Sequence, residues 1–134
     1  MKKVLVFGTF DNLHKGHLSF FSQARKIGDK LVVVVARDKT VWQIKKQLPV
    51  FSEAERLAQV SRCKNVDEAF LGSTNDKYEI LRIVKPDVIC LGYDQIAFVN
   101  KLAQKLIEYG LQTEIRRLKP YKEDIYKSSK LKGI

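Results

Sequence analysis

The chain has 134 residues, which is the length of one domain and enough to bury a hydrophobic core without disulfides or metal ions. Hydrophobic residues make up 45% of it and charged residues 30%, and no apolar run reaches about 18 residues, so we expect a globular protein without a transmembrane helix. The net charge of +10 favours anionic partners, either nucleic acid or phosphorylated small molecules.

Short apolar runs alternate with helical patterns along the chain. Residues 4–7 predict a buried strand, residues 15–27 an amphipathic helix that stops at Gly28, and residues 31–36 a strand covered on both faces. Residues 37–51 are polar and irregular, and the capping box of Ser52 and Glu55 starts the next helix. Later strands are predicted at 69–71, 88–91 and 113–118, and later helices at 78–84, at 96–109 and after Ser129.

This alternation predicts right-handed βαβ units and a parallel sheet with helices on both faces. We therefore expect a single domain over residues 1–134 with a Rossmann-like three-layer α/β/α sandwich and a mostly parallel five-stranded sheet. In such sheets, ligands bind beyond the carboxyl ends of the strands. Polar clusters follow three of the predicted strands, at residues 8–17, 37–46 and 92–95, which favours a single site.

The most informative cluster runs from Gly8 to His17 and holds both histidines of the chain. A strand, a tight polar turn and a helix N-terminus form an arrangement that binds phosphate groups. We expect His14 and His17 to face the phosphates of a nucleotide. The alternative is that they only cap the helix.

The two cysteines, Cys63 and Cys90, fall in a helix pattern and a strand pattern and lack the spacing of metal ligands. We expect two buried, reduced thiols rather than a disulfide or metal site. A strand pattern begins directly after Lys3, so we expect no signal peptide and a cytoplasmic protein.

The pattern Gly8-Thr9-Phe10-Asp11-x-x-His14-x-Gly16-His17 resembles the signature of the HxGH nucleotidyltransferase superfamily, which includes cytidylyltransferases, adenylyltransferases and archaeal FAD synthases. Residues 35–38, the pair Glu55-Arg56, residues 85–87 and residues 91–95 also have counterparts there. So does Tyr121-Lys122 upstream of Ser128-Ser129. One departure is Leu48, which stands where relatives have a lysine.

Within the superfamily the chain looks most like the archaeal FAD synthases, which transfer AMP from ATP to FMN and release pyrophosphate. The alternative is a cytidylyltransferase that uses CTP and glycerol 3-phosphate or another polyol or sugar phosphate. A third hypothesis, a basic nucleic-acid-binding module, is motivated by the net charge but leaves the histidine turn unexplained.

The resemblance implies catalytic roles for His14, His17, Arg56 and Lys46, and acceptor-binding roles for Asp11, Asp38 and Lys45. It implies that the nucleotide is bound by both histidines and by Gly8, Thr9, Phe10, Gly16, Gly92, Asp94, Lys122, Ser128 and Ser129. Several of these residues have plainer alternatives. In these alternatives, Asp11 only forms a turn, Arg56 forms a surface ion pair with Glu53 or a neighbour, and the two serines only cap a helix.

Trp42 either stacks on an aromatic ring of the acceptor or anchors its loop, and we favour the anchor. We expect Mg²⁺ or another divalent cation to arrive with the nucleoside triphosphate, held by phosphate oxygens and water rather than by a dedicated protein site. The expected partners are ATP or CTP and a phosphorylated small-molecule acceptor, with no nucleic acid and no membrane. The resemblance also implies a homodimer.

Overall fold

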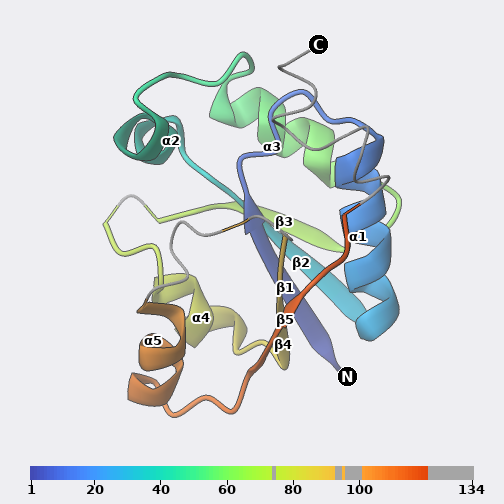
Figure 1. Ribbon diagram of the computed structural model, residues 1–134, viewed down its shortest axis with the longest axis vertical. Coiled ribbons are helices and arrows are strands. Elements are labelled where there is room, and N and C mark those ends of the chain that lie inside the picture. The colour runs from blue at the N-terminus through green and yellow to red at the C-terminus, as the bar shows by residue number, and fades with distance from the viewer. Residues whose placement is uncertain (74, 93–94, 96–100, 121–134) are drawn as a thin grey trace.

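The computed structural model describes residues 1–73, 75–92, 95 and 101–120. Its centre is a five-stranded sheet with the strand order β3-β2-β1-β4-β5, in which every neighbouring pair is parallel (Figure 1). The strands are β1 (Lys3–Gly8), β2 (Lys30–Val35), β3 (Glu68–Leu71), β4 (Val88–Leu91) and β5 (Glu114–Arg117). The helices are α1 (Lys15–Ile27), α2 (Asp38–Lys45), α3 (Glu53–Ser61), α4 (Glu79–Val84) and α5 (Leu102–Glu108). The predicted α/β sandwich is confirmed.

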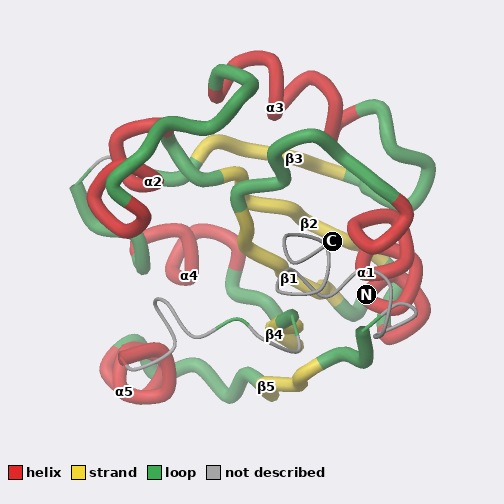
Figure 2. Tube along the Cα trace, turned by 45° about the horizontal axis from the view of Figure 1, so that its top comes forward, coloured by secondary structure: helices red, strands yellow, loops and turns green. Residues whose placement is uncertain are grey.

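Helices lie on both sides of the sheet (Figure 2), and each side holds an apolar cluster. Alternate side chains of β1 point to opposite faces, so Val4 and Val6 join one buried cluster and Leu5 joins the other. The first cluster packs against α1 and α3, through Phe21 and Val60 among others. The second packs against α4 and α5, through residues that include Leu81, Val84, Leu102 and Leu106. The central strand is therefore buried on both sides, as its continuous apolar run predicts.

The sequence prediction missed α2, which lies in the segment predicted to be irregular. This helix has eight residues, of which one, Val41, is buried, and an apolar pattern this short among polar residues is a weak helix signal. The predicted helix at 96–109 is observed as α5, beginning at Leu102; residues 96–100 lie outside the described part. The helix predicted after Ser129 also lies outside it.

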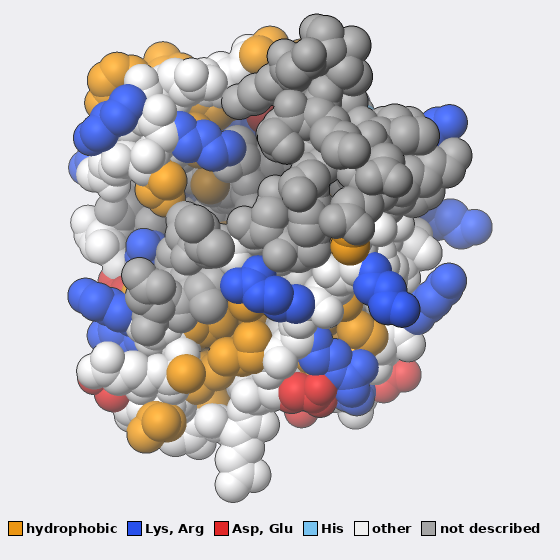
Figure 3. Space-filling view, in the orientation of Figure 1, with side chains coloured by type: hydrophobic (Ala, Val, Ile, Leu, Met, Phe, Trp, Pro, Cys, Tyr) orange, Lys and Arg blue, Asp and Glu red, His pale blue; other side chains and the backbone are white. Residues whose placement is uncertain are grey.

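Both cysteines are free thiols, as predicted, and Cys90 is buried in β4. The predicted burial of Cys63 is wrong, because this residue is half-buried just after α3. Burial raises the pKa of both, and that of Cys90 reaches about 11. Among the described residues, no helix is long and apolar enough to cross a membrane. Lysine and arginine side chains are scattered over the face seen in Figure 3 rather than gathered in one stripe.

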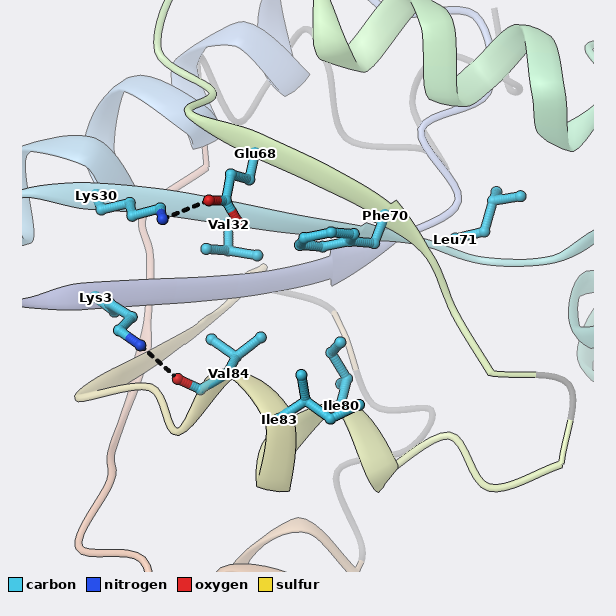
Figure 4. A pocket seen from close by; sticks show the side chains of 9 residues that line it. All are labelled: Lys3, Lys30, Val32, Glu68, Phe70, Leu71, Ile80, Ile83 and Val84. Carbon is cyan, nitrogen blue, oxygen red and sulfur yellow. Dashed lines mark hydrogen bonds and ion pairs between the residues drawn. The ribbon is translucent and has the colours of Figure 1, made fainter.

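A groove of about 340 Å³ lies between β3, at the edge of the sheet, and α4 (Figure 4). Phe70 and Ile83 contribute much of its apolar lining. Lys30 forms an ion pair with Glu68 on the sheet side, and Lys3 Nζ donates to the carbonyl oxygen of Val84 (2.9 Å). The lining includes no residue of the predicted site, so this groove is separate from it.

Candidate active site

The turn between β1 and α1 has an unusual backbone. Phe10 and Asn12 have φ angles of 52° and 54°, in the left-handed region that bulky residues rarely adopt. Such strain persists where the surroundings enforce it. Here the Phe10 ring is buried and packs on Phe21, with ring centroids 5.0 Å apart. A Cβ atom on Gly8 would lie 2.6 Å from the Phe10 ring, so Gly8 makes room for the ring that fixes the turn.

His14 and His17 form a capping box at the start of α1. His14 Nδ1 accepts the N–H of Gly16 (2.9 Å), and His17 Nδ1 accepts the N–H of His14 (3.3 Å). The two imidazole rings stack with centroids 4.0 Å apart, and the Phe10 ring meets His17 edge-on at 5.7 Å. A Cβ on Gly16 would lie 2.6 Å from His14 Cε1, so this glycine lets the His14 ring fold over the helix end.

This capping determines which nitrogen of each imidazole ring carries the proton. In a neutral imidazole one nitrogen donates and the other accepts, so an Nδ1 that accepts places the proton on Nε2. Desolvation by burial lowers the pKa of His17 to about 4, with a smaller lowering from His14 and Lys45 and an opposing effect of Asp11. Burial also lowers the pKa of His14. At neutral pH, both side chains are therefore uncharged rings with a donor at Nε2.

The N-terminus of α1 adds a second attraction for anions. The first N–H groups of a helix carry partial positive charge, and α1 has no acidic residue in its first turn to offset it. Thr9 and Phe10 continue from the carboxyl end of β1 beside this helix start. The turn can therefore hold a phosphate group between backbone N–H donors and two imidazole donors.

Arg56 is not on the surface, where the alternative of an ion pair with Glu53 or a neighbour placed it, and its ion pair is formed with Asp38. Its side chain is fully buried. The guanidinium donates to the carbonyl oxygens of Thr9 and Ala36 (both 2.8 Å) and of Phe51 (3.0 Å), and to Asp38 Oδ1 (2.7 Å). Arg56 thus fastens the ends of β1 and β2 to the start of α3.

The two predicted acceptor-binding carboxylates are also engaged by the protein itself. Asp38 Oδ1 accepts from Arg56, and its Oδ2 accepts the N–H of Glu53 (3.3 Å). Asp11 accepts the N–H groups of Val50 (2.7 Å) and Phe51 (2.9 Å). Through these hydrogen bonds Asp11 and Asp38 hold α2 and the segment between α2 and α3 against the histidine turn, and their acceptor-binding roles stay a prediction.

Lys45 and Lys46 lie at the end of α2 and are exposed. Lys45 is close enough to His17 for its charge to lower the pKa of that histidine. Lys46 caps α2 with a φ of 60° and donates its backbone N–H to the Trp42 carbonyl oxygen (2.9 Å). Lys45 is thus within electrostatic range of the histidine turn, and Leu48 is exposed.

Sequence reasoning included Arg37 and Gln95 in the polar clusters of the site but assigned neither of them a role. Arg37 donates to the Gly72 carbonyl oxygen (2.8 Å) and pairs with Glu53 (3.1 Å), so it ties the ends of β2 and β3 to α3. Gln95 donates to the Phe7 carbonyl oxygen (3.2 Å), and its Oε1 accepts the N–H of Gly92 (3.1 Å). Gly92 therefore lies at the carboxyl end of β4, linked to β1 through Gln95. Both residues belong to polar clusters that follow a strand, and this position was the available sequence signal.

Four predicted nucleotide-binding residues, Asp94, Lys122, Ser128 and Ser129, lie outside the described residues. Within the described ranges, no three His, Cys, Asp or Glu side chains gather in a way that would hold a metal ion.

The chain is similar to known proteins over most of its length. The family model described as cytidylyltransferase-like matches residues 5–134. The FAD synthase of Methanothermobacter thermautotrophicus is 45% identical over 126 residues, which cover 92% of this chain and 83% of that protein. The FAD synthase of Archaeoglobus profundus is 43% identical over 129 residues, which cover 96% and 82%.

Among solved structures, a protein of Thermoplasma volcanium GSS1 described as a lipopolysaccharide core biosynthesis protein superposes with a TM-score of 0.84. It is 42% identical to this chain, and the match covers 90% of this chain and 98% of that one.

Proposed function

The chain belongs to the cytidylyltransferase-like family, and on this premise we propose that it is an FMN adenylyltransferase. It transfers AMP from ATP to FMN: an oxygen of the FMN phosphate bonds to the α-phosphorus, the bond from that phosphorus to the bridging oxygen breaks, and pyrophosphate leaves. The identity of 42–45% to archaeal FAD synthases over most of their length supports this reaction. The observation that carries the proposal is the pair of uncharged histidine donors at the start of α1.

In this proposal the site works by position and charge rather than by covalent chemistry. The FMN phosphate is already ionised at neutral pH, so it needs no general base. Negative charge grows on the α-phosphate oxygens and on the bridging oxygen as the bond breaks. Nε2–H of His17 and the N–H groups of α1 are fixed beforehand, so they stabilise that charge without reorganising. His14 contacts the neighbouring phosphate, and Lys45 adds a positive charge nearby.

A divalent cation accompanies ATP in this reaction class. In this proposal the cation is held by triphosphate oxygens and water. Such an ion adds charge neutralisation at the phosphates.

The deciding experiment compares two substrate pairs with the same purified chain. With ATP, FMN and Mg²⁺, chromatography should show FAD and pyrophosphate formed in equal amounts. With CTP and glycerol 3-phosphate we expect no turnover. A cytidylyltransferase acting on a sugar or polyol phosphate is the competing function, and the likeness to the Thermoplasma volcanium protein is the observation that favours it. Turnover with CTP and glycerol 3-phosphate, but not with ATP and FMN, would refute the flavin reaction.

Replacing His17 tests the proposed donor. In His17→Ala we expect kcat for FAD formation to fall about 10²- to 10³-fold, because one fixed donor to the developing charge is lost. Lys26→Ala is the matched control, since Lys26 is an exposed residue in the last turn of the same helix. It should keep wild-type kcat. An unchanged kcat in folded His17→Ala would rule out the donor role.

A further inference from the structure

Trp42 is the only tryptophan of the chain, and half of its side chain, 51%, is exposed. The part of the ring that is covered fits the loop anchor that the sequence favoured, and the exposed part leaves a surface for the alternative, stacking on the acceptor. Burying a large aromatic ring is among the most stabilising contacts that a small protein can make. An aromatic ring that stays exposed beside a candidate active site is consequently a candidate for contact with a ligand.

The helix that carries Trp42 is fixed to the site. At its start, Asp38 is bound by Arg56 and by the N–H of Glu53, while the Asp38 N–H donates to Glu53 (2.9 Å). Val41 is buried and holds the helix against the core. α2 begins three residues after β2 ends, so it stands at the carboxyl edge of the sheet, the edge where β1 leads into the histidine turn (Figure 1).

The orientation of Trp42 on α2 follows from helical geometry. Trp42 and Lys45 are three residues apart, so their side chains are neighbours on one face of the helix. Asp38, four residues before Trp42, lies on the same face, and its Oδ1 accepts from Arg56, which also donates to the Thr9 carbonyl oxygen at the end of β1. This face of α2 is therefore the one that adjoins the histidine turn. A ligand whose phosphate lies beside His17 and Lys45 would have Trp42 one helical turn further along α2.

The surroundings of Trp42 are apolar as well as exposed. Ten large hydrophobic side chains are exposed among the described residues, and four of them lie between positions 42 and 50. These four are Trp42, Ile44, Leu48 and Val50. Single exposed apolar side chains are ordinary, whereas a cluster beside a site marks a surface that contacts a ligand or partner. Asp11 fastens this segment to the histidine turn through Val50 and Phe51.

We propose that Trp42 is a specificity-determining residue that stacks on the isoalloxazine ring of the acceptor, so that the site prefers a flavin phosphate to a polyol or sugar phosphate. This inference rests on the proposed function and adds the feature that recognises the acceptor. The flavin is a planar ring system with a phosphate at the far end of a flexible chain. It matches a site with an indole at one end and cationic and imidazole groups at the other.

The test measures KM for FMN and for ATP separately in four proteins: wild type, Trp42→Ala, Trp42→Leu and Trp42→Phe. Stacking a ring on an aromatic side chain corresponds to about a ten- to hundredfold change in affinity. We therefore expect Trp42→Ala to raise KM for FMN by that factor, with kcat and KM for ATP within about threefold of wild type. Trp42→Leu keeps an apolar side chain without a ring, so it should resemble Trp42→Ala. Trp42→Phe keeps an aromatic ring and should restore much of the affinity for FMN.

Ile107→Ala is the matched control, because Ile107 is an exposed apolar residue on α5 and should leave every constant unchanged. A second readout is the fluorescence of bound FMN, which an indole quenches by electron transfer when the two rings stack. The wild type should quench it and Trp42→Leu should not.

If the wild type forms FAD but Trp42→Ala and Trp42→Leu keep the wild-type KM for FMN, stacking is wrong and the proposed function stands. An equal rise in both KM values would also overturn stacking, because Trp42 would then support the fold of the whole site. If the wild type neither binds FMN nor forms FAD, the proposed function fails and the inference fails with it.

Discussion

At the residue scale, the Nδ1 atoms of His14 and His17 are committed to the backbone at the start of α1. Helix capping and phosphate binding are therefore not alternatives for these residues. Capping holds each ring in place and leaves its proton on Nε2, which is the state that a phosphate oxygen accepts from. Phe10 supports the same arrangement by packing edge-on against His17.

The buried, uncharged state of His17 predicts how stability depends on pH. Its pKa falls from 6.5 to about 4 on folding, so between these values the unfolded chain takes up a proton that the folded chain does not. Stability should fall as pH drops from about 6.5 toward 4, with His17 accounting for up to about 3 kcal/mol.

Urea unfolding at pH 7, 5.5 and 4.5 measures this effect. His17→Asn keeps an acceptor near the His14 N–H and removes the titrating ring, so its loss of stability over this range should be smaller than that of wild type. Equal losses in the two proteins would show that His17 does not titrate as described.

At the element scale, one buried guanidinium organises the carboxyl edge of the sheet. Arg56 of α3 reaches carbonyl oxygens at the ends of β1 and β2 and the carboxylate at the start of α2. Its partners come from separate stretches of sequence, around residues 9, 36–38 and 51. The family resemblance implied a phosphate contact for Arg56. The local pattern around Arg56 predicts its helix but does not show which distant groups its side chain contacts.

Removing this guanidinium should mainly lower the free energy of unfolding, and activity should fall as a consequence. In Arg56→Met we expect unfolding to become easier by about 3 kcal/mol, because three carbonyl oxygens and Asp38 lose their donor. Arg62→Met is the control, since Arg62 is exposed at the end of the same helix and should change stability by less than about 0.5 kcal/mol. Urea titration measures both. Equal stabilities for Arg56→Met and wild type would contradict the anchoring role.

The elements that sequence patterns predicted are those with strong local signals. β1 and β2 have uninterrupted apolar runs, and α3 has its capping box, which the structure contains. α2 lacked such a signal because contacts through Asp38 and Val41, rather than an apolar face, hold it in place. The histidine turn was predictable because its ten residues are contiguous. The structural roles of Asp11 and Asp38 were not, because their partners lie about 40 and about 15 residues away.

At the scale of the whole molecule, the homodimer implied by the family resemblance stays a prediction. Light scattering on the eluting peak of a sizing column should give twice the chain mass of 15.4 kDa. A mass of one chain at micromolar concentration would refute it.

The central claim is that the histidine turn of this chain holds the phosphate at which AMP is transferred. A crystal structure with a non-hydrolysable ATP analogue and Mg²⁺ tests it most directly. We predict that an α-phosphate oxygen will lie within hydrogen-bond distance of His17 Nε2, with the triphosphate at the N-terminus of α1. A triphosphate bound elsewhere, with both histidines out of its reach, would contradict the account.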